Sequence, residues 1–161
     1  SLSTWGEVKS FVDVSGSIAS PKVYVAGCRV PSLDYVLLGG LSLTFLDRLG
    51  YAGIVVNGTI RDFDDVSELS VPIWSHGYGI MDSQGCMKVE SRSLECLVNG
   101  FKVSQNDVII GDGNGVVSVP KEQVKRIISK AIEIEIIEAR ILNGVKKGED
   151  LYTLVENGGH I

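Results

Sequence analysis

The chain has 161 residues, with 15 Lys and Arg against 20 Asp and Glu, which gives a formal net charge of −5. This length predicts a single domain spanning 1–161, and a hydrophobic content of 44% excludes extensive disorder. The acidic balance argues against direct nucleic-acid binding, and no apolar run is long enough to predict a membrane-spanning helix. With no signal-peptide pattern and cysteines that lack CxxC spacing, the sequence predicts a cytoplasmic protein with reduced thiols.

The first half of the chain predicts helices and strands in alternation, separated by glycine and proline. The continuous apolar run over 52–56 predicts a strand that is buried on both faces. In chain order, the predicted elements are a helix over 5–12, a strand over 22–27, a helix over 37–49 closed by Gly50, the strand over 52–56, a helix over 62–69 and a strand over 71–74.

The second half predicts β-hairpins followed by one long helix. Strands are predicted over 87–89, 101–103, 107–110 and 116–119. The last two are joined at Asp112-Gly113-Asn114-Gly115, because Asn-Gly between apolar runs is a strong hairpin signal. A C-terminal helix is predicted from about 121 to 143, ended by Gly144, with a short turn over 151–154 after it. This order predicts an α/β fold that mixes parallel and antiparallel pairing.

Arg61 and Asp62 follow a buried strand and precede an acidic helix start, a position where α/β folds place ligands. Arginine offers a planar pair of donors that matches a carboxylate, and aspartate offers the hard oxygen atoms that suit Mg²⁺. Side by side, the two residues could hold a keto acid on a metal ion. The alternative from the residues alone is that Arg61 pairs with the acids of its own helix start, which are Asp62, Asp64 and Asp65.

Three further motifs are weaker candidates. Gly39-Gly40-Leu41-Ser42 places glycines ahead of a helix whose first N–H groups could bind an anion, although a plain turn explains the glycines equally well. His76 follows a strand and could act as a base or carry a phosphoryl group, but an isolated loop histidine more often does neither. The turn over 112–115 is similar to part of a calcium loop, but it lacks the later acidic ligands, which favours a hairpin.

Four blocks are more specific together than any one of them alone. They are LGGL at 38–41, GYAGIVVNGTIRD at 50–62, VPIWSHG at 71–77, and NDVIIGD with GVVSVP at 106–112 and 115–120. On these blocks, and over about residues 22–144, the chain resembles the RraA-like family. That family includes the regulator of ribonuclease E activity and the 4-hydroxy-4-methyl-2-oxoglutarate aldolases.

The resemblance implies a swivelling β/β/α domain with a mixed sheet, assembled as a homotrimer with sites at the subunit interfaces. In enzymatic members a divalent metal, usually Mg²⁺, holds a 2-keto acid. These members release pyruvate by retro-aldol cleavage of 4-hydroxy-4-methyl-2-oxoglutarate and by decarboxylation of oxaloacetate. Carried over by motif, Arg61 is a catalytic and substrate-binding residue, and Asp62 is a catalytic residue that ligates the metal. The substrate's carboxylate is then bound by the backbone of Gly39, Gly40, Leu41 and Ser42.

Two departures from the family pattern concern the site. Many aldolases have an aspartate where this chain has Gly40, whereas others have glycine there and acidic residues just after the Arg-Asp pair. This chain resembles the second group, with Asp65 as a further metal contact and Val66 in place of a second acid. The chain also looks short at its N-terminus beside the family, and an acid/base group is expected from a neighbouring subunit's Glu135 or Glu138.

We therefore expect a divalent-metal-dependent lyase, of the class II aldolase or oxaloacetate decarboxylase type, acting on a small-molecule 2-keto acid. The intact Arg61-Asp62 pair favours this function. The alternative is a non-catalytic regulator that binds a ribonuclease as a protein partner, for which net acidity would suit a basic surface. A phosphohistidine carrier acting through His76 is a third hypothesis.

Overall fold

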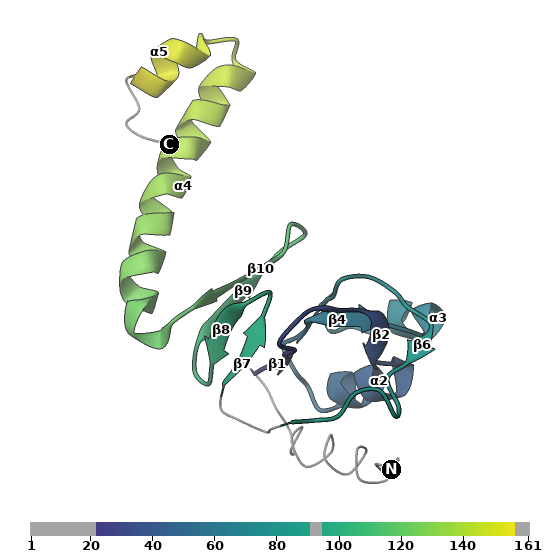
Figure 1. Cartoon of the computed structure of the whole chain (residues 1–161). Helices are drawn as coiled ribbons and strands as arrows, with labels where there is room; N and C mark the ends of the chain where they lie inside the picture. The colour runs from purple at the N-terminus through teal and green to yellow at the C-terminus, as the bar shows by residue number, and fades with distance from the viewer. Residues whose placement is uncertain (1–21, 91–94, 157–161) are drawn as a thin grey trace. The chain divides into compact units, whose positions relative to one another are not determined.

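The computed structural model describes residues 22–90 and 95–156, so the helix predicted over 5–12 lies outside the described residues. The chain divides into two compact units, residues 1–118 and residues 119–161. The first unit carries the sheets, and the second carries the C-terminal helices (Figure 1). The mixed α/β class predicted from the sequence is confirmed, with several small sheets in place of one continuous sheet.

One sheet of the first unit is parallel and three-stranded. Its order is β1 (Val23–Ala26), β3 (Gly53–Val56) and β5 (Ile73–Trp74). All four residues of β3 are buried, because the strand has a neighbour on each side and is covered by apolar side chains. The predicted strands over 22–27, 52–56 and 71–74 are therefore confirmed, with somewhat shorter bounds.

A second parallel sheet has the order β4 (Gly58–Ile60), β2 (Ser32–Leu38) and β6 (Met81–Asp82). The chain passes directly from β3 in the first sheet to β4 in the second, and Asn57 is the single residue between them. Asn57 is fully buried, so this crossing lies inside the unit. The strand that delivers the Arg-Asp motif is thus β4, not the apolar run before it.

The helix predicted over 37–49 is wrong at its start. Leu38 is the last residue of β2, where it pairs with Ile60, and helix α2 spans Gly40–Arg48. Gly39 has an extended backbone (φ −109°, ψ 178°) and separates the strand from the helix. The helix ends as predicted, because Gly50 adopts the left-handed φ of +79° that terminates a helix.

An apolar core joins both parallel sheets to α2 and to the short helix α3 (Phe63–Ser67). Leu43 and Leu46 of α2 and Ile54 of β3 are completely buried in this core. The core cluster comprises Leu38, Leu43, Leu46, Ile54, Val56, Ile60, Val66 and Val71. Because these contacts hold α2 and α3 against the strands, they also fix the strand ends from which the two helices start.

The remaining strands form hairpins. β7 (Glu95–Val98) pairs antiparallel with β8 (Phe101–Ser104), and β9 (Val108–Gly111) pairs with β10 (Val116–Val119). The predicted strand over 87–89 is wrong, because this segment has no strand partner and follows the turn over 83–87. The β7–β8 turn is Asn99-Gly100, with φ of +50° and +79°, as a tight type I′ hairpin requires.

The second unit consists of the turn η1 (Lys121–Gln123), helix α4 (Val124–Lys146) and helix α5 (Leu151–Glu156). The expectation that Gly144 ends the long helix is wrong, because Gly144 lies buried within α4. A Cβ at this position would lie 2.6 Å from Leu154 Cδ2, so glycine here permits close packing of α5. No helix in the described part of the chain is long and apolar enough to cross a membrane.

Candidate functional site

The Arg-Asp motif lies where two neighbouring parallel strands end. β2 runs into the start of α2, and β4 runs into Arg61 and Asp62 ahead of α3. The backbone N–H of Arg61 donates to the Leu38 carbonyl at 3.2 Å, which aligns the two strand ends. The N–H of Gly40 donates to Asp62 Oδ2 at 2.8 Å. The Gly39-Gly40 and Arg61-Asp62 motifs are therefore in direct contact, through two residues that are 22 positions apart in the sequence.

Asp62 adopts an unusual backbone conformation at this junction. Its φ of 67° and ψ of 58° lie in the left-handed region, which costs a non-glycine residue about 1 kcal/mol. Its carbonyl accepts the first backbone hydrogen bond of α3, from Val66 N at 3.0 Å, while its carboxylate turns to the other helix, α2. The strain therefore places one carboxylate at the positive end of α2 instead of at its own helix.

The two glycines that precede and start α2 allow a close approach of the acidic and basic side chains that follow β4. A Cβ at Gly39 would lie 2.9 Å from both Arg61 Nε and Asp62 Oδ2. A Cβ at Gly40 would lie 3.0 Å from Asp62 Cβ and 3.0 Å from Asp65 Oδ2. The Arg-Asp pair and Asp65 thus pack directly on the glycine backbone.

The first turn of α2 also presents backbone donors. Leu43 N is the first amide to bond back into the helix, to Gly39 O at 3.0 Å, so the N–H groups of Leu41 and Ser42 have no helix carbonyl within reach. The side chain of Leu41 is 88% exposed, which leaves this turn open to solvent. Amides in this position, at the positive end of the helix, suit an anionic group such as a carboxylate.

The guanidinium of Arg61 is held by Asp82, a residue that the sequence analysis does not assign to the site. Its Nη1 lies 3.0 Å from Asp82 Oδ2, and its Nε lies 3.6 Å from Asp62 Oδ2. The hydrogen bond from the Gln84 backbone and then that from Arg61 hold the pKa of Asp82 below its usual range. Within the described residues, the ion pairs of Arg61 are to Asp82 and Asp62. The alternative, in which Arg61 pairs with the acids of its own helix start, is therefore confirmed for Asp62, whereas the described residues show no ion pair of Arg61 with Asp64 or Asp65.

The donor set at this junction fits a magnesium ion. Mg²⁺ is commonly held by one or two carboxylates, with water and substrate oxygens completing its coordination. Asp62 and Asp65 supply two carboxylates beside Gly40, and the described residues contain no cluster of three or more His, Cys, Asp and Glu suited to a metal. These two carboxylates are donors of the kind that a hard cation with few protein ligands takes.

The other sequence candidates have structural partners. His76 Nε2 lies 3.2 Å from Asn57 Oδ1, which weighs against the phosphohistidine carrier because this nitrogen is bonded to the buried Asn57. Asp112 Oδ1 accepts hydrogen bonds from the backbone N–H groups of Asn114 at 2.7 Å and Gly115 at 3.2 Å. The carboxylate of Asp112 thus caps its own hairpin turn, as the hairpin interpretation predicts.

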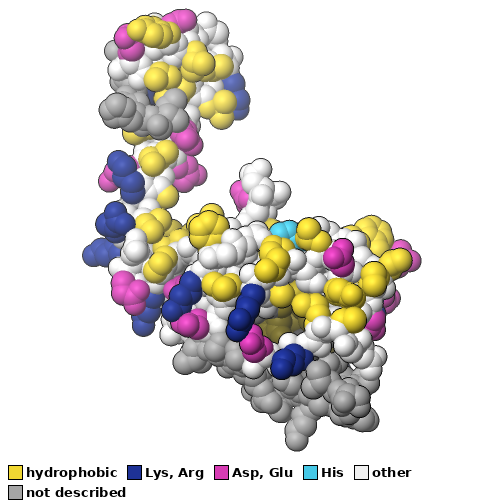
Figure 2. Space-filling model, in the orientation of Figure 1, with side chains coloured by type: hydrophobic (Ala, Val, Ile, Leu, Met, Phe, Trp, Pro, Cys, Tyr) yellow, Lys and Arg dark blue, Asp and Glu magenta, His cyan; other side chains and the backbone are white. Residues whose placement is uncertain are grey.

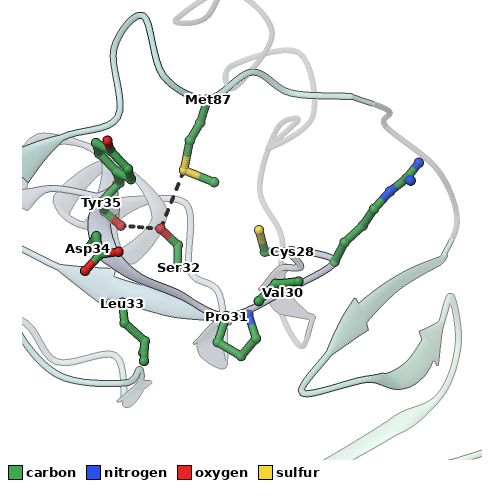
Figure 3. Close-up of a pocket in the computed structure, with 9 residues that line it drawn as sticks. Cys28, Val30, Pro31, Ser32, Leu33, Asp34, Tyr35 and Met87 are labelled. Atoms are coloured by element: carbon green, nitrogen blue, oxygen red, sulfur yellow. Dashed lines mark hydrogen bonds between the residues drawn. The ribbon is translucent and has the colours of Figure 1, made fainter.

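A shallow pocket of about 360 Å³ lies at the opposite end of β2 from the Arg-Asp motif (Figure 3). At its wall, Ser32 Oγ donates to the Tyr35 carbonyl at 2.7 Å and lies 3.5 Å from Met87 Sδ. The guanidinium of Arg29, which also lines the pocket, is paired with Glu90 at 2.8 Å. The cation in this pocket is therefore already neutralised, and the pocket is separate from the Arg61 site.

The family model described as Aldolase/RraA, of the RraA-like group, matches residues 4–118. The chain belongs to the RraA-like family. This match includes the Gly39-Gly40 and Arg61-Asp62 motifs and all of the described sheets apart from the last residue of β10. The family expected from the four sequence blocks is thereby confirmed.

Two curated proteins are similar to this chain over part of their length. Protein MJ0644 of Methanocaldococcus jannaschii is 32% identical over 117 residues, which cover 70% of this chain and 54% of that protein. A protein of Halalkalibacterium halodurans, named as a putative 4-hydroxy-4-methyl-2-oxoglutarate aldolase, is 32% identical over 95 residues, or 59% of this chain and 45% of that protein. The chain thus spans about half the length of these two relatives.

A solved structure gives the same fold with a different named role. Streptomyces coelicolor RraAS2 is described as an unusual member of the RNase ES inhibitor RraA protein family. It superimposes with a TM-score of 0.64 at 27% identity, over 86% of this chain and 67% of that chain. The family therefore includes proteins named as aldolases and proteins named as inhibitors of RNA processing.

Proposed function

We propose that this protein is a divalent-metal-dependent lyase that acts on 2-keto acids and releases pyruvate. The observation that carries the proposal is the contact between Gly40 N and Asp62 Oδ2, which brings the Arg-Asp motif to the open first turn of α2. This contact places a cation, a hard carboxylate and anion-binding amides around one point on the surface. The aldolase name of the Halalkalibacterium relative supports the same reaction class.

The residues divide the binding of a 2-keto acid among them. The amides of Leu41 and Ser42 bind the substrate's carboxylate at the positive end of α2. Arg61 donates to the carboxylate or to the keto oxygen through its planar fork. Asp62 and Asp65 hold the metal ion, which, when bound, supplies Lewis-acid stabilisation of the negative charge that develops as the C–C bond breaks.

Removal of the metal is expected to abolish turnover. Pyruvate release should be measured from oxaloacetate and from 4-hydroxy-4-methyl-2-oxoglutarate, with Mg²⁺ and with an excess of chelator. We expect release only with Mg²⁺, because Arg61 carries a single delocalised charge and the proposal assigns stabilisation of the enolate to the metal ion. Because Mg²⁺ alone decarboxylates oxaloacetate slowly, the protein-free reaction with Mg²⁺ is the reference. Release that persists at the same rate with chelator would contradict the metal requirement.

Exposed apolar side chains beside the site support the proposed homotrimer. Leu41, Phe63 and Ile80 are 88%, 61% and 93% exposed, and each lies close in sequence to a site residue. Figure 2 shows several hydrophobic side chains on one exposed face of this unit. Such side chains are typical of a surface that another subunit covers. Light scattering is expected to give the mass of a trimer, and a clean monomer would contradict the shared site.

The alternative function is a non-catalytic regulator that binds an RNA-processing enzyme. Its support is the structural similarity to the Streptomyces protein that is named in an inhibitor family. The pyruvate assay separates the two functions. A folded protein that gives no release above the protein-free rate would favour the regulator and contradict the lyase.

A further inference from the structure

We propose that Asp82 is a positioning residue that fixes the Arg61 guanidinium for substrate binding. This inference rests on the proposed function of the Arg61 site. Asp82 Oδ2 accepts a hydrogen bond from Arg61 Nη1 at 3.0 Å. Asp82 is not part of the Arg-Asp motif and comes from a different strand, β6.

The contact leaves the substrate-binding side of the guanidinium open. Asp82 engages Nη1, and Asp62 faces Nε at 3.6 Å, so the two carboxylates lie on different nitrogens of the same group. Within the described residues Nη2 takes part in neither ion pair, and its two hydrogens are donors that a carboxylate can accept. Asp82 therefore does not occupy the whole fork. It restricts the rotation of a long side chain that is 40% exposed.

The backbone on both sides of the contact is set by the sheet. Val36 of β2 is paired with Asp82 on one side and with Thr59 on the other. Thr59 precedes Arg61 by two residues, so Asp82 and Arg61 extend from neighbouring positions across β2. Asp82 therefore lies on one side of β2 and Arg61 follows directly on the strand at its other side, next to the register shift of the β2–β4 pairing between Val36 and Leu38.

The carboxylate of Asp82 is itself held in place. Its Oδ1 accepts a hydrogen bond from Gln84 N at 2.9 Å. The turn that follows is closed by the N–H groups of Cys86 and Met87, which both donate to the Ser83 carbonyl, at 3.0 and 2.9 Å. One oxygen of Asp82 thus anchors the carboxylate to a turn while the other holds Arg61. A carboxylate fixed in this way can orient a guanidinium, whereas a freely rotating one cannot.

A positioning role predicts a specific kinetic pattern. An exposed ion pair contributes little to stability, so the fold should survive loss of Asp82. A mobile Arg61 must be ordered when substrate binds, and this entropic cost weakens binding. We expect Asp82→Asn to raise the KM for oxaloacetate about 3- to 10-fold, with kcat much less affected. Asp82→Glu keeps the carboxylate and should restore part of the affinity.

The experiment uses the whole chain of residues 1–161 with Mg²⁺ and compares Asp82→Asn and Asp82→Glu with Glu68→Gln. Glu68 is an exposed carboxylate at the end of α3, so this control removes the same charge from nearby without touching Arg61. KM and kcat are measured for oxaloacetate, and the affinity for oxalate is measured by calorimetry. The NMR signal of the Arg61 Nε–H, identified by its absence in Arg61→Lys, reports on the guanidinium directly.

We expect Asp82→Asn to weaken oxalate binding, raise KM and shift the Arg61 signal toward that of a mobile arginine, with no change in Glu68→Gln. An unchanged Arg61 signal together with an unchanged KM in Asp82→Asn would overturn the proposal. If the wild-type chain neither turns over oxaloacetate nor binds oxalate, the proposed function fails. The Arg61 signal would then still decide whether Asp82 positions the guanidinium, so the two failures are distinguishable.

Discussion

Replacement of Arg61 by alanine is expected to lower pyruvate release by about a thousandfold and to leave the fold intact. Arg61 is the cation that the structure brings to the Asp62 carboxylate and the α2 N-terminus. Its removal deletes the donors for the substrate's carboxylate or keto oxygen, and it leaves Asp62 and Asp82 without their shared counter-charge. The loss should appear in kcat/KM for oxaloacetate with saturating Mg²⁺.

Two further variants separate chemistry from folding. Arg61→Lys keeps the positive charge but not the planar fork, so an intermediate loss is expected. Arg48→Ala removes an arginine from the last turn of α2, at the end of this helix remote from the site, and should leave turnover unchanged. Because the Arg61 side chain is 40% exposed, circular dichroism of Arg61→Ala should match the wild type. Undiminished turnover in a folded Arg61→Ala would contradict the lyase assignment of this site.

The neighbourhood of Arg61 was predictable only in part. The Arg-Asp pair after a buried apolar run and ahead of an acidic helix predicts one strand-to-helix junction, whereas β2, the strand that leads into the glycine pair, has no counterpart among the predicted elements. The structure joins the two pairs through the contact of Gly40 N with Asp62 Oδ2. The residues carried over from the family motif, including Asp65, accordingly lie around a single point.

Asp82 was not predictable, because its position depends on two features without a sequence signal. β6 is only two residues long, and it pairs with β2 across a separation of more than forty residues. Apolar and polar residues do not alternate regularly along β2, whose sequence ends in Val-Leu-Leu just before α2. The pairing of β2 with β4 also shifts register twice. The contact of Arg61 with Asp82 is therefore a tertiary feature.

The hairpin at Asn99-Gly100 is absent from the predicted elements although its sequence carries a turn signal. The same Asn-Gly rule that predicts the turn at 114–115 applies at 99–100, where apolar residues lie on both sides. The structure shows both residues with positive φ between β7 and β8. The signal was thus present in the sequence, and the strand predicted over 87–89 took the place of β7 in the predicted order.

Replacement of Asn57 by alanine is expected to lower the free energy of unfolding of the first unit by about 3 kcal/mol. Asn57 is completely buried where the chain crosses from β3 to β4. Its Nδ2 donates to the carbonyls of Cys28 at 2.8 Å and Leu97 at 3.4 Å, and its Oδ1 accepts from Asn99 N at 3.2 Å. Alanine would leave these backbone groups without the side chain and would also open a cavity.

The measurement is urea unfolding followed by the fluorescence of Trp74, in a Trp5→Phe background so that one tryptophan reports. Asn114→Ala is the matched control, because Asn114 is exposed in a hairpin turn and its loss should cost less than about 0.5 kcal/mol. Asn57→Leu fills most of the volume but supplies no hydrogen bonds, so it should be nearly as unstable as Asn57→Ala. A stable Asn57→Leu would mean that volume, and not hydrogen bonding, holds the crossing that places Arg61.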